Sequence, residues 1–146
     1  MYQKDYILRM IEMIGELIAG LLGLIKKGEF QQAQQSIENA YYTFLQQDAS
    51  LLQNIPADRL TDTLLQEHNY THGHLEILSE LFFAQAELFY AQGKVKESLP
   101  FYEKSLLLLS FTEKVSKSWS DEKQERLSYL RKQLGISEDP EPVELQ

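Results

Sequence analysis

Cysteine is absent from the 146 residues of this chain. Disulfide bonds and thiolate metal sites are therefore excluded, because both need the cysteine sulfur. The absence is compatible with a reducing compartment. The overall fractions of hydrophobic residues (43%) and charged residues (25%) are those of an ordinary globular protein, and the length suits a single domain.

Basic clusters and long hydrophobic runs are missing as well. The chain has 14 Lys and Arg against 22 Asp and Glu, for a net charge of −8. Nucleic acids and anionic membrane surfaces bind clustered Lys and Arg, so we expect neither as a partner. The longest uncharged run near the N-terminus, Leu17–Ile25, is too short to span a bilayer. Asp5 and Glu12 argue against a signal peptide, and we expect a cytoplasmic protein.

Apolar residues recur at intervals of three and four residues along most of the chain, which is typical of one face of a helix. The first such stripe consists of Ile7, Ile11, Ile14, Ile18, Leu21 and Ile25. Similar stripes predict further helices over about 30–45, 56–65, 75–91, 95–109 and 119–134, the last beginning at a capping-box-like Ser118 with Asp121 three residues on. Residues 68–74 read as a loop because of Asn69, Thr71 and Gly73. We predict an all-α fold of five or six helices in one domain over residues 1–135. The acidic residues 136–146 would form a disordered tail.

Two glycines, Gly28 and Gly93, divide this pattern into two similar segments, 65 positions apart. Each glycine would let the chain reverse after a first helix. Small residues follow both glycines at the same two offsets, and large ones fill the positions between them. The small residues are Ala33 and Ala40 in the first segment and Ser98 and Ser105 in the second. Paired helices could therefore approach closely within each segment.

This spacing resembles the tetratricopeptide repeat, a helix–turn–helix unit of about 34 residues. The match is good over residues 75–110 and fair over 10–45. The string DYILRMIEMIG (residues 5–15) also resembles the opening of a bacterial family of tetratricopeptide-like proteins of unknown function, and that resemblance covers most of the chain. It implies antiparallel helix hairpins stacked as a short right-handed superhelix. It implies nothing about activity, because one fold hosts many functions.

Stacked hairpins of this kind expose a groove between their first helices, and such grooves usually hold an extended or helical segment of another protein. We therefore predict a protein–protein interaction scaffold rather than an enzyme, with no cofactor. The candidate groove residues are polar and aromatic positions of the first helices: Arg9, Glu16, Gln85 and Tyr90.

A stripe of small residues, Gly15, Ala19 and Gly23, follows one side of the first helix. Each glycine inside a helix costs about 1 kcal/mol relative to alanine, so a close contact should offset it. The interpretation we favour is packing against another helix of the same chain. The alternative is a homodimer that self-associates along this stripe, with helix one as the seam.

All three histidines, His68, His72 and His74, fall within seven residues. His68 and His72 could share a helix face and bind a divalent metal, with Glu67 or Glu76 completing the site. No HExxH pattern, glycine-rich phosphate loop or nucleophile elbow accompanies them. We favour an exposed polar loop without metal and keep the metal site as an alternative.

Overall fold

The computed structural model describes residues 2–116 and 120–136, and over these residues the regular secondary structure is all helical, without strands. The predicted all-α class is confirmed. The long helices are α1 (Tyr2–Lys26), α2 (Phe30–Ala40), α5 (His72–Ala91), α6 (Val95–Ser116) and α7 (Asp121–Leu134). The short ones are the π-helical η1 (Tyr41–Leu45), α3 (Ala49–Gln53), the 3₁₀-helical η2 (Ala57–Arg59), α4 (Leu60–Asp62) and the π-helical η3 (Thr63–Glu67).

Both long hairpins reverse at a glycine in the same way. Gly28 and Gly93 have φ angles of +81° and +82°, in the left-handed region that glycine tolerates best. After each glycine, a backbone N–H donates back to the preceding helix: Glu29 N to Leu24 O at 2.9 Å, and Lys94 N to Phe89 O at 2.8 Å. These bonds define a Schellman turn. The two predicted reversals are confirmed, and their local geometry repeats.

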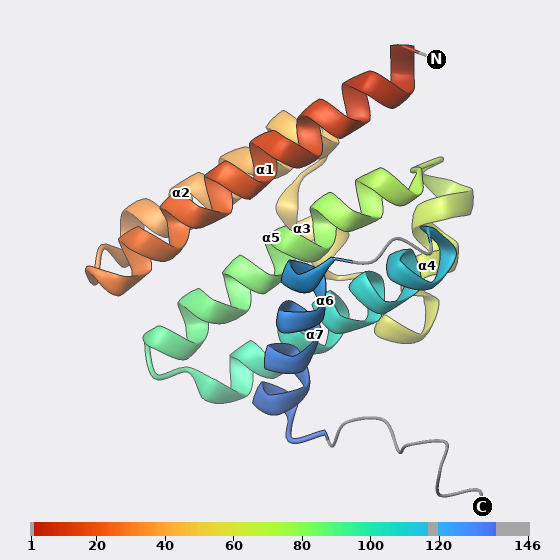
Figure 1. Ribbon diagram of the computed structural model, residues 1–146. Helices are drawn as coiled ribbons and strands as arrows, with labels where there is room; N and C mark the ends of the chain where they lie inside the picture. Colours follow the sequence, from red (N-terminus) through yellow and green to blue (C-terminus); the bar gives the residue numbers. More distant parts are fainter. Residues whose placement is uncertain (1, 117–119, 137–146) are drawn as a thin grey trace, which may run out of the picture.

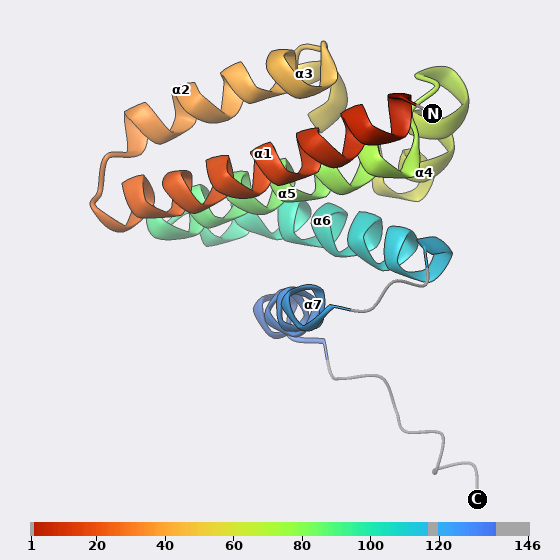
Figure 2. The same cartoon turned by 45° about the horizontal axis from the view of Figure 1, so that its top comes forward.

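Helix α5 lies at the centre of the molecule. The α1–α2 pair covers one side of it and α6 covers another (Figure 1). Buried residues therefore occur on nearly every side of α5, as expected for a helix that is apolar nearly all round. They are Leu75, Ile77, Leu78, Ser79, Leu81, Phe82, Phe83, Ala84, Gln85, Ala86 and Leu88. Figure 2 shows α1, α5 and α6 running across the view while α7 is seen nearly end-on, so α7 crosses the other long helices.

Small polar residues lie between the antiparallel helices α5 and α6. Ser79 and Ser105 are fully buried. Ser79 Oγ donates to Ser105 O at 2.8 Å, and Ser105 Oγ donates to Ser79 O at 2.9 Å. Because each hydroxyl is satisfied by the facing backbone, the buried serines carry no desolvation penalty of an unpaired group. The two helices can therefore approach closely at this point.

The start of α5 differs from the prediction. The helix begins at His72, so the predicted loop over residues 68–74 is too long. Thr71 is the N-cap: its hydroxyl accepts from His74 N at 3.4 Å, while His74 Nδ1 accepts from Thr71 N at 3.0 Å. This is a capping box in which a histidine takes the place of the usual Glu or Gln. Asn69, Thr71 and Gly73 are typical loop residues, so the sequence did not indicate that Thr71 is an N-cap.

Two further expectations concern the ends of the chain. Residues 137–146, the greater part of the predicted acidic tail, lie outside the described residues. The right-handed superhelix stays a prediction. Among the helices that the structure describes, none combines the length and the apolar character needed to cross a membrane.

Candidate functional site

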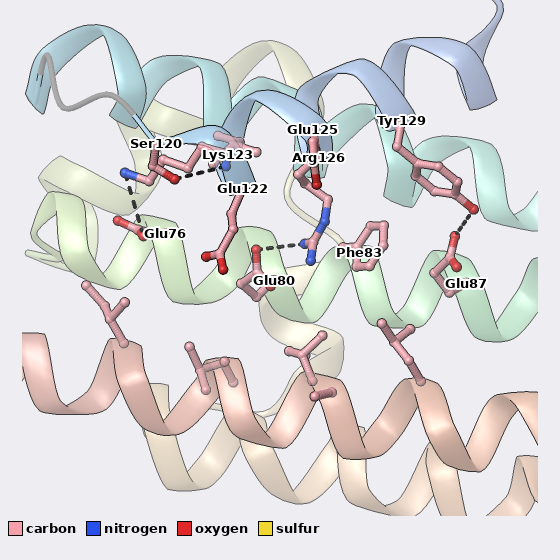
Figure 3. Close-up of a pocket in the computed structure, with 17 residues that line it drawn as sticks. Glu76, Glu80, Phe83, Glu87, Ser120, Glu122, Lys123, Glu125, Arg126 and Tyr129 are labelled. Atoms are coloured by element: carbon pink, nitrogen blue, oxygen red, sulfur yellow. Dashed lines mark hydrogen bonds and ion pairs between the residues drawn. The ribbon is translucent and has the colours of Figure 1, made fainter.

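A groove with a volume of about 600 Å³ lies between α1, α5 and α7 (Figure 3). Its α1 wall consists of Ile11, Ile14, Gly15, Ile18, Ala19 and Leu22. Its α5 wall consists of Glu76, Glu80, Phe83 and Glu87. Helix α7 contributes Glu122, Lys123, Glu125, Arg126 and Tyr129, its N-cap residue is Ser120, and Leu109 comes from α6.

The α1 and α5 walls are built from equivalent positions of the two hairpins. The pairs are Ile11 and Glu76, Gly15 and Glu80, Ile18 and Phe83, and Leu22 and Glu87. Every pair is separated by 65 positions, the interval between the two turn glycines. The repeated layout therefore brings the same helix face of each hairpin to one groove. The chemistry does not repeat: α1 presents aliphatic side chains and gaps, whereas α5 presents three carboxylates and a phenylalanine.

Two ion pairs join α7 to the α5 wall. Arg126 Nη1 lies 2.8 Å from Glu80 Oε2, and the guanidinium also lies 3.7 Å from the centre of the Phe83 ring. Lys123 Nζ lies 3.8 Å from Glu76 Oε2. Partly exposed pairs of this kind each contribute about 1 kcal/mol or less. Their larger effect is to fix the position of α7 across α5, so that three helices enclose the groove.

Glu87 is held by two tyrosine hydroxyls. Tyr102 Oη donates to Glu87 Oε2 at 2.5 Å, and Tyr129 Oη donates to the same oxygen at 2.6 Å. Burial, followed by the hydrogen bond to Glu87, raises the pKa of Tyr129 to about 12, and the same two causes raise the pKa of Tyr102. Both hydroxyls therefore stay protonated and keep donating to the carboxylate at neutral pH.

The groove carries more negative than positive charge. Five of its lining residues are glutamates and two are cations. Burial, with a smaller contribution from the neighbouring Glu80, raises the pKa of Glu76, while Lys123 opposes this change. Glu122 projects from α7 toward α5 (Figure 3). Within the described part of the chain, Glu122 and Glu125 are exposed and have no ion-pair partner. The groove is thus an apolar wall facing an acidic one.

The residues predicted for partner binding lie outside this groove. Arg9 and Glu16 are exposed on α1 but do not line it. Tyr90 is 48% exposed, and its ring packs edge-on against Tyr102 with the ring centroids 6.5 Å apart. Gln85 is only 2% exposed, so its predicted place on the groove surface is wrong.

The side chain of Gln85 faces α2 instead. Gln85 Nε2 donates to Gln34 Oε1 at 3.0 Å, and Gln34 Nε2 donates to Gln85 Oε1 at 3.2 Å. This reciprocal pair satisfies a buried amide that would otherwise be costly. The prediction selected residues by polarity on the first helices, whereas the register of α1 against α5 decides which positions reach the groove.

The small-residue stripe of α1 is not packed against the rest of the chain. A Cβ atom added at Gly15 or at Gly23 would meet no atom within 4 Å. The interpretation that the stripe packs within the chain is therefore wrong. Gly15 and Ala19 line the groove, and Gly23 does not. The alternative of a homodimer seam along these three residues stays a prediction.

The three histidine rings stack on two aromatic neighbours. His68 and His74 stack on Tyr70, with ring centroids 5.4 Å and 4.8 Å away, and His72 stacks on Phe111 at 5.5 Å. Over residues 2–116 and 120–136, no group of three or more His, Cys, Asp or Glu side chains could hold a metal ion. These rings contribute aromatic packing and, at His74, a helix cap.

Sequence reasoning missed Glu80, Phe83 and Arg126, an ion pair of the groove and the aromatic ring on which its guanidinium lies. A signal for the first two was available. Adding the 65-position interval to Gly15 and Ile18 gives Glu80 and Phe83 directly. No comparable signal exists for Arg126, because α7 has no counterpart in the first hairpin and its crossing angle follows from tertiary packing.

Comparisons of this chain with protein-family models, with curated proteins and with solved structures gave no match. The resemblance to tetratricopeptide-like proteins therefore stays a prediction that rests on the repeated spacing.

Proposed function

We propose that this protein is a protein-interaction module whose groove between α1, α5 and α7 binds a segment of another protein. The observation that carries the proposal is the uncovered pair of small residues in the α1 wall. Gly15 and Ala19 are exposed, and the chain places no atom near a Cβ at Gly15. Three glycines, Gly15, Gly20 and Gly23, weaken this 25-residue helix without any packing gain inside the chain, and of these Gly15 lines the groove. A partner that packs in the gap would offset that cost.

The dimensions of the groove suit a short helix or strand. Its α1 wall runs from Ile11 to Leu22, about three helical turns or about 16 Å. Grooves between helices commonly hold segments of this length through a few apolar anchors. The fixed position of α7, tied to α5 through Arg126 and Lys123, means that the site exists before the partner arrives.

The test is a selection of random peptides, roughly twelve residues long to match three turns, against the full chain. Peptides enriched on the wild type are then measured on two variants. Gly15→Leu fills the groove, and Gly20→Leu is its matched control. Gly20 lies on the same helix, has equally open space around it and does not line the groove. Circular dichroism establishes that both variants fold.

We expect Gly15→Leu to weaken the selected peptides by about tenfold or more, which corresponds to about 1.4 kcal/mol. Gly20→Leu should leave their affinity unchanged. If no peptide is enriched, or if both variants bind as the wild type does, the groove is not an interaction site.

Self-association through α1 is the second candidate, favoured by the same uncovered Gly15 and Ala19 and by Tyr6 and Met13, which are about half exposed on this helix. Light scattering across a range of protein concentrations tests it. A dimer mass that Gly15→Leu abolishes would support self-association. A monomer mass at every concentration would eliminate it.

A further inference from the structure

The two facing walls of the groove differ in chemistry, and the difference specifies what would fit between them. This inference rests on the proposed function. We propose that the groove selects a basic amphipathic helix, with apolar side chains against α1 and Lys or Arg side chains against the carboxylates of α5 and α7.

The negative charge of the groove supports the proposal that the bound helix is basic. Lys123 and Arg126 already pair with Glu76 and Glu80, which leaves the exposed carboxylates of Glu122 and Glu125 in excess. Charges near a protein surface interact more strongly than charges in bulk water, because the effective dielectric constant is lower there. A cationic segment therefore gains from entering the groove, whereas an anionic segment is repelled.

The contacts of Arg126 show how the α5 wall binds a cation. Its guanidinium lies on the face of the Phe83 ring and pairs with Glu80 at the same time. Flat guanidinium groups are well suited to this combination of ring face and carboxylate. Glu122, beside Glu80 in Figure 3, offers a carboxylate at the same level of the groove for a cation of the partner.

The shape of the α1 wall supports the proposal that the bound segment is a helix. The partly buried Ile11 and Leu22 lie on the groove side of α1, and the exposed Gly15 and Ala19 form low points between them. Helices pack by placing ridges of side chains into such low points, and small side chains allow a short distance between helix axes. A leucine-sized side chain of a partner helix would fill the space over Gly15.

A second copy of this chain is a poorer occupant. The chain has a net charge of −8, and its last nine residues include Glu138, Asp139, Glu141 and Glu144. Self-association in the groove would bring like charges together unless one of the few basic positions entered it. Nucleic acid is disfavoured for the same reason.

The experiment uses three synthetic helical peptides that share one leucine stripe and differ only on the polar face, which carries Lys, Gln or Glu. Fluorescence anisotropy measures their binding to the full chain. We expect the Lys peptide to bind at least about tenfold more tightly than the Gln peptide, and the Glu peptide to bind more weakly than both. Raising the salt concentration should weaken only the Lys peptide.

A matched pair of variants separates the groove from the general negative charge of the chain. The groove variant carries Glu122→Gln and Glu125→Gln. The control carries Glu97→Gln and Glu103→Gln on α6, outside the groove, with the same change in net charge. Glu97 and Glu122 are both exposed glutamates in the first turn of their helices. The groove variant should lose about tenfold in affinity for the Lys peptide, and the control should not.

The outcomes distinguish this inference from the proposed function. If the Gln or Glu peptide binds as tightly as the Lys peptide and Gly15→Leu blocks binding, the inference is overturned and the groove still binds peptides. Equal losses in the groove variant and in the control mean non-specific attraction, and they also overturn the inference. If no peptide binds, or Gly15→Leu has no effect, both proposals fail.

Discussion

The two long hairpins share a layout but differ in how much of their first helix is covered. Both reverse at a glycine with a φ near +80°, and equivalent positions lie 65 residues apart. Yet α5 is buried on nearly every side, whereas the buried side chains of α1 follow one stripe, Met10, Ile14, Ile18, Leu21 and Ile25. The comparison shows that local sequence sets the turn and the helix, while the neighbours of each helix set its burial.

The sharpest test of this comparison is a pair of equivalent positions, Leu78 in α5 and Met13 in α1. Leu78 is 0% exposed and Met13 is 48% exposed. We expect Leu78→Ala to lower the free energy of unfolding by about 2–5 kcal/mol, because it leaves a cavity in the core. Met13→Ala should lower it by about 0.5 kcal/mol or less, since surface changes rarely exceed that. Urea denaturation measures both, and losses of similar size would contradict the assigned burial.

A glycine at the contact between the two hairpins should respond strongly to a single methyl group. A Cβ atom added at Gly73, in the first turn of α5, would overlap Cγ2 of Ile7 in α1. We expect Gly73→Ala to destabilise the fold by about 1–3 kcal/mol through overpacking. The control is the same change in an Ile7→Ala background, where the obstructing methyl is gone. The penalty should shrink there, and an unchanged penalty in the double-mutant cycle would place its origin elsewhere.

The same substitution in the uncovered part of α1 should have the opposite sign. Gly15 has no atom within 4 Å of an added Cβ. Gly15→Ala should therefore raise the free energy of unfolding by about 1 kcal/mol, the difference in helix propensity. Gly23→Ala should behave in the same way, because its surroundings are equally open. Thermal denaturation measures the gain, and destabilisation by either change would mean that the stripe is covered.

The smallest expected effect is a pH dependence of stability at the start of α5. It comes from His74, whose equivalent position in α1 is Arg9. Burial lowers the pKa of His74 below its ordinary value of 6.5. The neutral ring accepts the Thr71 N–H through Nδ1, and a protonated ring could not. Its positive charge would also oppose the helix dipole.

Since the folded pKa of His74 lies below the unfolded one, the unfolded chain binds more protons between the two values. The stability contributed by the neutral cap is complete above the unfolded pKa of about 6.5. It falls as the pH drops through that value and stops falling below the folded pKa. Urea midpoints measured from roughly pH 8 to pH 5 should show the decrease. His74→Gln keeps a capping side chain and should remove this part of the decrease. An identical profile in that variant would assign the decrease to other groups.

Much of the fold could be predicted from the sequence because its signals are local. Gly28 and Gly93 mark the reversals, and the apolar stripes mark the helices. The start of α5 was missed because His74 acts as a cap in a role that Glu or Gln usually fill. The polar residue Gln85 was expected at the surface, and its partner Gln34 lies 51 positions away in the chain, beyond the reach of any local pattern.

The sequence could predict that the candidate site is a groove between helices, but it could not predict most of the residues that line this groove. A groove between first helices follows from the repeated layout, and Gly15 and Ala19 do line it. Which residues face them depends on the register of α5 and on the crossing of α7, and neither is encoded by spacing alone. Glu80 and Arg126 look like ordinary surface charges until tertiary packing brings them together across Phe83.

The central position of α5 also has a consequence for how the molecule is made. Helix α1 contacts α5 more than any other helix, yet 65 residues separate the end of α1 at Lys26 from the end of α5 at Ala91. At about 5–20 residues per second, a ribosome needs roughly 3–13 s to add them. During that interval the nascent α1 lacks its main packing surface, so its apolar stripe stays uncovered until α5 has been made.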